Sequence, residues 1–174
     1  NNAGTFDILG DFSIIQSAGP AGSTFNNLAG AIFRKSGGTG TSQLTGNTAM
    51  VFNNAGTVQA LSGTLSLLNG GTHNAGTFDG NGGTITFNSV QTFNGANMFS
   101  GNTALQGGAF AGAGSIGNSG SFDLQVDASI APSFNNTGTV TKTGGTVSGT
   151  FFNGGLSNSG TVRANVGLLA INGS

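Results

Sequence analysis

The stretch Phe134-Asn135-Asn136-Thr137-Gly138-Thr139-Val140 holds the pattern that decides the fold, Asn-x-Gly-Thr between two apolar residues. Copies with the form Asn-x-Gly-(Thr/Ser)-apolar begin at Asn2, Asn54, Asn74, Asn118, Asn136 and Asn158. A looser copy with one inserted residue runs from Asn26 to Ile32 and includes Asn27. Self-similarity of this kind is typical of solenoid proteins, in which each repeat packs only against its neighbours.

The glycines of the motif set the length of the repeat. They fall at Gly4, Gly30, Gly56, Gly76, Gly120, Gly138 and Gly160. The longest step, from Gly76 to Gly120, is twice the mean step, and a degenerate copy around Phe93 to Phe99 would fill it. The period is then roughly 22 residues, which predicts about eight coils and, at the usual spacing of strands, a rod near 40 Å long.

Short strands should connect these motifs. A second element lies half a repeat later at Gly63–Leu67, Gly83–Phe87 and Gly145–Phe151, and it alternates apolar with small polar residues. That alternation is the signature of a strand with one buried face. We therefore expect an all-β parallel β-helix, a β-solenoid, with two or three strands in each coil and one domain over residues 1–174.

The motif itself is suited to a sharp corner between strands. Glycine readily adopts positive φ, and Asn is the next most tolerant residue. In stacked coils, equivalent Asn amides can donate to one neighbour and accept from the other. The expected corner ladder consists of Asn2, Asn27, Asn54, Asn74, Asn118, Asn136 and Asn158 with Gly4, Gly56, Gly76, Gly120, Gly138 and Gly160.

Composition excludes several functions. Only 5% of the 174 residues are charged, against about 25% in ordinary soluble domains, and there is no Cys, Trp or Tyr. The four basic residues are scattered, so no basic stripe could neutralise phosphates, and we expect no nucleic-acid partner. The apolar runs are far shorter than the roughly 20 residues of a membrane-spanning helix.

The repeats Phe52–Val58 and Phe134–Val140 resemble the β-strand repeats of large bacterial autotransporter and filamentous-haemagglutinin-type surface proteins. The resemblance covers essentially the whole chain. It implies a right-handed parallel β-helix outside the bacterial cell, working as a spacer or adhesive stalk.

Catalytic β-helices need clustered carboxylates, basic residues or calcium, which makes a glycan-binding or glycan-cleaving module the alternative reading. Asp123 and Asp127 form a near pair, and Asp7 and Asp11 repeat its spacing. We interpret all four as strand-face residues. Asp7, Asp79 and Asp123 share one place in the motif but fall on distant coils. We interpret His73, the one histidine, as a turn residue rather than a catalytic base.

A third reading is an ice-binding solenoid. Thr-x-Thr patterns occur at Thr39 and Thr41, at Thr84 and Thr86, and from Thr139 to Thr143. Outward Thr is also what any neutral strand favours. Because these patterns do not recur at one place in every repeat of the sequence, ice binding is disfavoured.

The leading hypothesis is a structural, non-enzymatic segment of an extracellular adhesin or fibre, with no catalytic, cofactor or metal site. Apolar residues from Leu168 to Ile171 close the chain without a polar cap, so we expect a longer protein or end-to-end self-association. Host or matrix glycans are the candidate partners. Any functional specificity should lie in residues 88–115, where the repeat fades.

Overall fold

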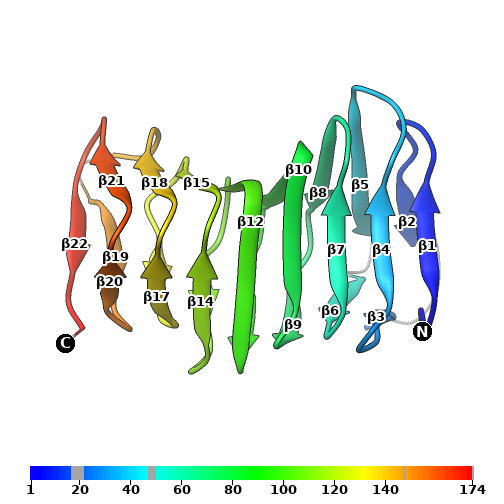
Figure 1. Ribbon diagram of the computed structural model, residues 1–174, viewed down its shortest axis with the longest axis horizontal. Coiled ribbons are helices and arrows are strands. Elements are labelled where there is room, and N and C mark those ends of the chain that lie inside the picture. Colours follow the sequence, from blue (N-terminus) through cyan, green and yellow to red (C-terminus); the bar gives the residue numbers. More distant parts are fainter. Residues whose placement is uncertain (17–21, 47–49, 147, 174) are drawn as a thin grey trace.

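The computed structural model describes residues 1–16, 22–46, 50–146 and 148–173, and all the regular elements in these ranges are β-strands. The strands lie across the long axis of the molecule and stack along it, with the N- and C-terminal ends at opposite ends of the stack (Figure 1). Neighbouring turns are joined by parallel pairing throughout the described chain. The prediction of an all-β parallel solenoid is confirmed.

Each turn gives one strand to each of three faces. The first face contains β1 (Thr5–Ile8), β4 (Ile32–Lys35), β7 (Thr57–Ala60), the first parts of β10 (Thr77–Phe87) and β12 (Ala96–Leu105), β14 (Ser115–Asn118), β17 (Ser133–Asn136) and β20 (Leu156–Asn158). The second face contains β2 (Ile14–Gln16), β5 (Thr41–Gly46), β8 (Thr64–Leu67), the second parts of β10 and β12, β15 (Ser121–Leu124), β18 (Thr139–Lys142) and β21 (Thr161–Ala164). The two long strands therefore pass from one face to the next, and the register of β10 shifts between Gly80 and Thr84.

The third face is a separate sheet of eight strands. These strands are β3 (Thr24–Asn27), β6 (Val51–Asn54), β9 (Gly71–Asn74), β11 (Gln91–Asn94), β13 (Phe110–Ala111), β16 (Ser129–Ile130), β19 (Thr150–Phe152) and β22 (Leu169–Ile171). Six of them have a neighbour on both sides, whereas β3 and β22 lie at the edges. About six turns are thus fully stacked, slightly fewer than the roughly eight coils expected, because the two end turns each keep an open side.

The length of a turn changes along the stack. The turn that separates Thr5 from its partner Ile32 is much longer than the turn that separates Gly117 from its partner Asn135. The degenerate copy fills its gap, since Phe99 pairs with Phe78. Residues 88–115 are also as regular as the rest, because β11, β12 and β13 continue all three faces. The expectation that this stretch is irregular is therefore wrong, although the sequence motif fades there.

The Asn-x-Gly-Thr motif moves to another corner midway along the stack. Residues that follow the motif in the first half, such as Thr57 and Thr77, pair within the first face. In the second half, Ser121, Thr139 and Thr161 pair within the second face. The long step from Gly76 to Gly120 therefore spans two turns and one further strand, β14. One sequence pattern thus occupies two structural columns.

The half-repeat element is only partly equivalent in its three copies. Leu65 and Ile85 pair on the second face, as their shared pattern indicates. Around the third copy, the strand is Thr150–Phe152 on the third face, and Val147 lies outside the described residues. The assignment of Gly145–Phe151 to the same column is wrong because the motif before it, at Thr139, already lies on the second face, so the following strand falls on the third.

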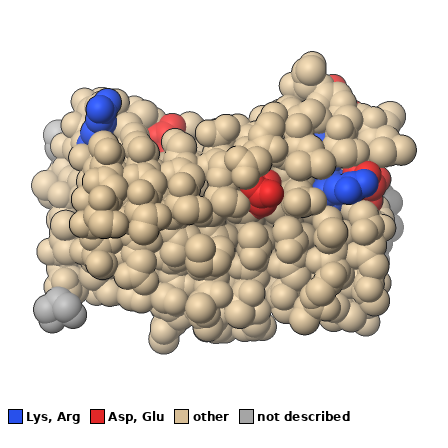
Figure 2. Space-filling model, in the orientation of Figure 1, with Lys and Arg blue, Asp and Glu red and all other residues tan. Residues whose placement is uncertain are grey.

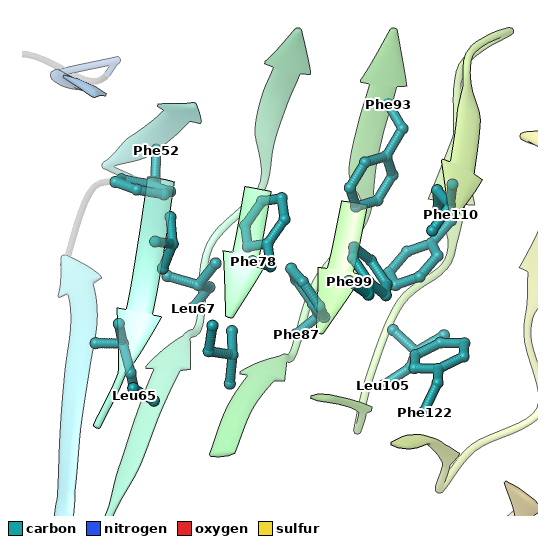
Figure 3. Packing of buried hydrophobic residues seen from close by; sticks show 14 of the residues in the cluster. Phe52, Leu65, Leu67, Phe78, Phe87, Phe93, Phe99, Leu105, Phe110 and Phe122 are labelled. Atoms are coloured by element: carbon teal, nitrogen blue, oxygen red, sulfur yellow. The ribbon is translucent and has the colours of Figure 1, made fainter. Parts of the chain in front are cut away.

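Phenylalanine fills the inside of the stack. Rings from successive turns contact one another. Figure 3 shows Phe87 beside Phe99 and Phe110 beside Phe122, with centroid distances of 5.4 Å and 5.7 Å. The rings of Phe122 and Phe134 are 5.4 Å apart. The side chains of these five residues are at most 1% exposed. Each aromatic pair adds about 0.5–1.5 kcal/mol beyond burial alone. Stability is thus distributed along the axis instead of being centred in one place.

Candidate functional site

An asparagine ladder joins the first three turns at the corner between the third and first faces. Asn2 Nδ2 donates to Asn27 Oδ1, and Asn27 Nδ2 donates to Asn54 Oδ1, both at 2.8 Å. Asn27 Nδ2 also donates to the Thr57 carbonyl at 3.1 Å. Because Asn27 and Asn54 are only 1% exposed, these bonds replace the water that the amides lose on burial.

A second ladder lies at the next corner, between the first and second faces. Asn118 Nδ2 donates to Asn136 Oδ1, and Asn136 Nδ2 donates to Asn158 Oδ1, both at 2.7 Å. Asn74 belongs to neither ladder. Its side chain is exposed, and the residue that pairs with Asn54 in the next turn is His73, not Asn74. Asn97, which the sequence motif did not indicate, accepts instead from the Gly76 N–H at 2.8 Å.

Most of the motif glycines are needed for close packing, and only Gly30, in the looser copy, has the expected positive φ, at 79°. Gly4, Gly56, Gly76, Gly120, Gly138 and Gly160 all have ordinary φ, so the expected left-handed corner is wrong for them. A Cβ on Gly138 would lie 2.1 Å from the Gly120 carbonyl oxygen of the preceding turn. A Cβ on Gly4, in the first turn, would meet no atom within 4 Å. The requirement for glycine therefore comes from the neighbouring turn.

Two buried lysines tie corners of adjacent turns together. Lys35 is 0% exposed, and its Nζ lies 2.8 Å from Asp11 Oδ1 and donates to the carbonyls of Gly37 and Gly38. Asp11 also accepts from the Gly40 N–H at 3.0 Å. We call this arrangement the N-terminal lysine clasp.

The C-terminal lysine clasp repeats the arrangement. Lys142 is 0% exposed, and its Nζ donates to Asp127 Oδ1 at 2.8 Å and to the Gly144 carbonyl at 2.7 Å. Asp127 accepts from the Thr146 N–H at 2.7 Å. The lysine of each clasp begins the same sequence, Lys-(Ser/Thr)-Gly-Gly-Thr. This duplicated motif is the signal by which sequence reasoning could have found the clasps.

The clasps lower the pKa of their carboxyl groups. The hydrogen bond from Lys142, followed by that from Thr146, holds the pKa of Asp127 well below its ordinary value. The hydrogen bond from Lys35 likewise lowers the pKa of Asp11. Both carboxylates stay charged at neutral pH and neutralise a buried ammonium, so their geometry suits a structural role.

The remaining aspartates, Asp7, Asp79 and Asp123, are each engaged with their own polar partners. Asp7 pairs with Arg34 at 2.7 Å on the first face, and Asp79 accepts from Ser100 Oγ at 3.0 Å on the same face. Asp123 lies on the second face, where it accepts from Gln125 and Thr143. The expectation that these three share one position is wrong for Asp123. Within the described ranges, no three His, Cys, Asp or Glu side chains gather in a way that could hold a metal ion.

His73 is a core residue, and the interpretation as a turn residue is wrong. It lies in β9, is 0% exposed, and packs its ring 4.9 Å from the rings of Phe78 and Phe93. Its Nε2 lies 3.0 Å from Oε1 of Gln91, which is also fully buried. Burial lowers the pKa of His73 to about 4, so the ring is neutral at pH 7.

A polar trough runs along the second face and is the strongest candidate for a binding site. Its volume is about 390 Å³, and it crosses β5, β8, β10 and β12 and ends at Gln125, directly after β15. The lining residues are Thr41, Gln43, Thr64, Ser66, Leu68, Thr84, Thr86, Asn88, Ala104, Gln106 and Gln125. A second hollow, which contains Asn102, Ser121 and Asp123, shares part of this lining and continues it.

The strand register places small polar side chains at the same position of successive turns along one wall of the trough. Thr41, Thr64 and Thr84 are successive partners in one column, and Asn102, Ser121, Thr139 and Thr161 extend that column. Small polar residues thus recur at one position of the coils. Complete Thr-x-Thr pairs do not, as expected from the sequence, since Gln43 and Ala104 occupy the second position in their turns. The repeat hides this column because the motif changes corner, so that Thr84 and Thr139 follow different local sequences.

The chain matches no protein-family model, and comparison with curated proteins and with solved structures gave no match either. In the part of the chain that the structure describes, no helix has the length and apolar character needed to cross a membrane.

Proposed function

We propose that this chain is a rigid structural segment of an extracellular bacterial surface adhesin or fibre. The continuous stack of parallel turns, with its distributed core, is the observation that carries this proposal. Every described turn is joined to the next by backbone pairing. Contacts between phenylalanine rings and, at several corners, buried amides or ion pairs join many of the turns as well. Such a solenoid holds its two ends at a fixed separation without needing any chemistry.

The surface and the resemblance in sequence support the same role. The face shown in Figure 2 carries few charged groups among neutral residues. The resemblance of Phe52–Val58 and Phe134–Val140 to repeats of bacterial surface proteins supports a location outside the cell. We assign no catalytic role, since Asp11 and Asp127 are engaged with buried lysines and Asp123 with neighbouring polar groups.

The two ends of the stack provide the surfaces for association. At the first turn, Leu9, Phe12 and Ile15 are 75%, 70% and 58% exposed. At the last turn, Leu168 and Ile171 are 46% and 55% exposed. Exposed apolar residues beside unpaired strand edges favour addition of a further strand. We propose that the ends pack head to tail, against a second copy or against further coils of the same fibre.

Light scattering over a range of protein concentrations tests this association. We expect the average mass to rise with concentration, and a Leu9→Lys/Phe12→Lys variant to remain monomeric. Val90→Lys is the matched control, because Val90 is 50% exposed but lies away from both ends. A wild-type protein that stays monomeric at high concentration would contradict self-association through the ends.

A further inference from the structure

We propose that the polar trough binds an uncharged polysaccharide, with the sugar chain lying along the stack axis. This binding activity goes beyond the proposed structural role and does not depend on it. A rod without the trough would still be a spacer, and a trough on an isolated segment would still bind its ligand.

The shape of the trough fits a linear polymer. Ser66, Thr86 and Ala104 form its floor and are only 4%, 3% and 3% exposed, although they belong to the outward side of their strands. The residues on either side therefore stand above them as walls. Neighbouring turns are spaced by about 4.8 Å, so a trough that spans five turns, from Thr41 to Gln125, is about 20 Å long. A chain of sugars laid in it would meet an equivalent rung at every strand.

The polar groups of the trough floor are hydrogen-bonded to one another, whereas the hydroxyls of one wall are available to bind a ligand. On the floor, Thr86 Oγ1 donates to Ser66 Oγ at 3.0 Å, and Asn88 Nδ2 donates to the same oxygen at 2.7 Å. On the wall, the hydroxyls of Thr41, Thr64 and Thr84 make no hydrogen bond with the described part of the chain. The floor is thus fixed in place, while the wall has free groups that both donate and accept.

Charge selects the class of sugar. The eleven lining residues of the trough include no acidic or basic side chain, and Asp123 borders only the hollow that continues it. A sulfated or uronic-acid chain would lose hydration in the trough without meeting a cation, whereas neutral hydroxyls can exchange water for Thr, Gln and Asn groups. A neutral polysaccharide is therefore favoured over an anionic one.

Ice is a poorer fit to the same surface. An ice-binding face has to present a flat, regular lattice of groups, but here the floor lies below the walls. The column of Gln43, Ser66, Thr86 and Ala104 also mixes side chains of different length. The trough accommodates a ligand that is narrow and long.

Isothermal titration with neutral oligosaccharides tests the proposal. The probes are β-1,4-linked glucose, mannose and N-acetylglucosamine oligomers of two to eight units, with a sulfated hexasaccharide as the anionic comparison. We expect at least one neutral series to bind, with affinity rising until the oligomer reaches the length of the trough and then levelling off. The sulfated probe should bind at least tenfold more weakly.

Variants locate the site. Ala104→Phe fills the floor from a position that faces the trough, and it should weaken binding at least tenfold. Thr92→Phe is the matched control on the outward side of β11 in the third face, and its affinity should be unchanged. Should Ala104→Phe fail to fold, as judged by circular dichroism, Thr64→Val/Thr84→Val removes two wall hydroxyls at constant volume and should weaken binding at least fivefold.

Three results would overturn the proposal. They are the absence of binding to every neutral series at millimolar concentration, affinity that is independent of oligomer length, and binding that survives in the trough variants. Thermal hysteresis that is abolished by Thr64→Val/Thr84→Val, in a protein that binds no sugar, would assign the trough to ice instead.

Discussion

Lys35 and Asp11 are far apart in the sequence, yet the ammonium of Lys35, which is completely buried, lies 2.8 Å from the carboxylate of Asp11 on the preceding turn. Lys142 and Asp127 repeat the relationship at the same distance. A buried lysine is tolerated only with a partner, because an isolated ammonium is strongly disfavoured away from water. Each clasp thus makes the corner of one turn depend on the turn before it.

Removing the carboxylate of the C-terminal clasp should destabilise the protein more than removing the whole charged pair. In Asp127→Ala, the buried ammonium of Lys142 keeps only carbonyl partners, whereas Lys142→Met/Asp127→Ala leaves an apolar chain of similar volume. We expect the lower urea midpoint for the single variant at pH 7. The lowered pKa of Asp127 means that its contribution is present above pH 3.8 and is lost as the pH falls further. Equal midpoints at pH 7 for the two variants would argue against the clasp.

Gly138→Ala should destabilise the solenoid by about 1–3 kcal/mol or more, as expected for overpacking. The added Cβ would meet the Gly120 carbonyl oxygen at 2.1 Å, so the two turns must move apart. Gly4→Ala is the control with the same motif position but no preceding turn, and it should change stability by less than about 0.5 kcal/mol. Denaturant titration of the two variants measures this difference. Similar losses in both would mean that backbone conformation, not close packing, selects glycine.

Asn136→Ala should lower the free energy of unfolding by about 1–3 kcal/mol, because it removes a buried amide that bonds to both neighbouring turns. The groups affected are Asn118 Nδ2 and Asn158 Oδ1. Asn74→Ala is the matched control, since Asn74 is exposed and lies outside both ladders. Thermal unfolding should show a clear loss of melting temperature only for the first variant. A large effect at Asn74 would contradict the assignment of the ladders.

Stability should fall as the pH is lowered from 6.5 to about 4. The folded pKa of His73 is about 4, below the ordinary 6.5, so the unfolded chain binds the extra proton throughout this window. The shift corresponds to a loss of about 3 kcal/mol over the window. His73→Phe/Gln91→Leu removes the buried polar pair and should flatten the dependence, which urea unfolding at several pH values would measure. A pH slope that persists in this variant would assign it to other groups.

The sequence alone was sufficient for the fold because every turn repeats the same local chemistry. Period-2 strands such as Thr64–Leu67 and corners such as Asn136-Thr137-Gly138 are visible without long-range information. The number of fully stacked turns was overestimated because end turns look the same in sequence as inner ones. The register between strands of neighbouring turns could not be predicted from the sequence, because it depends on the lengths of the corners, which carry little sequence signal.

Register is also why the site was missed. Thr84 and Thr139 lie in one column only because the motif moves by one corner between Gly76 and Gly120. The burial of Lys35 and His73 likewise depends on the neighbouring coil, which is not adjacent in the sequence. The usual expectation that lysine and histidine lie at the surface was therefore wrong for both residues. The duplicated Lys-(Ser/Thr)-Gly-Gly-Thr sequence was the one local sequence feature that indicated the two lysine clasps.

The parallel pairing of successive turns also has a mechanical meaning. Backbone hydrogen bonds between neighbours such as Val140 and Val162 point along the stack, so a pull on the two ends loads them in tension, one layer at a time. Under stretching, the chain should therefore peel from an end and release a short length with each layer. The turns that hold a lysine clasp should need the highest force to unfold. Because both clasps lie in the outer parts of the stack, the middle turns should stay folded under repeated stretching.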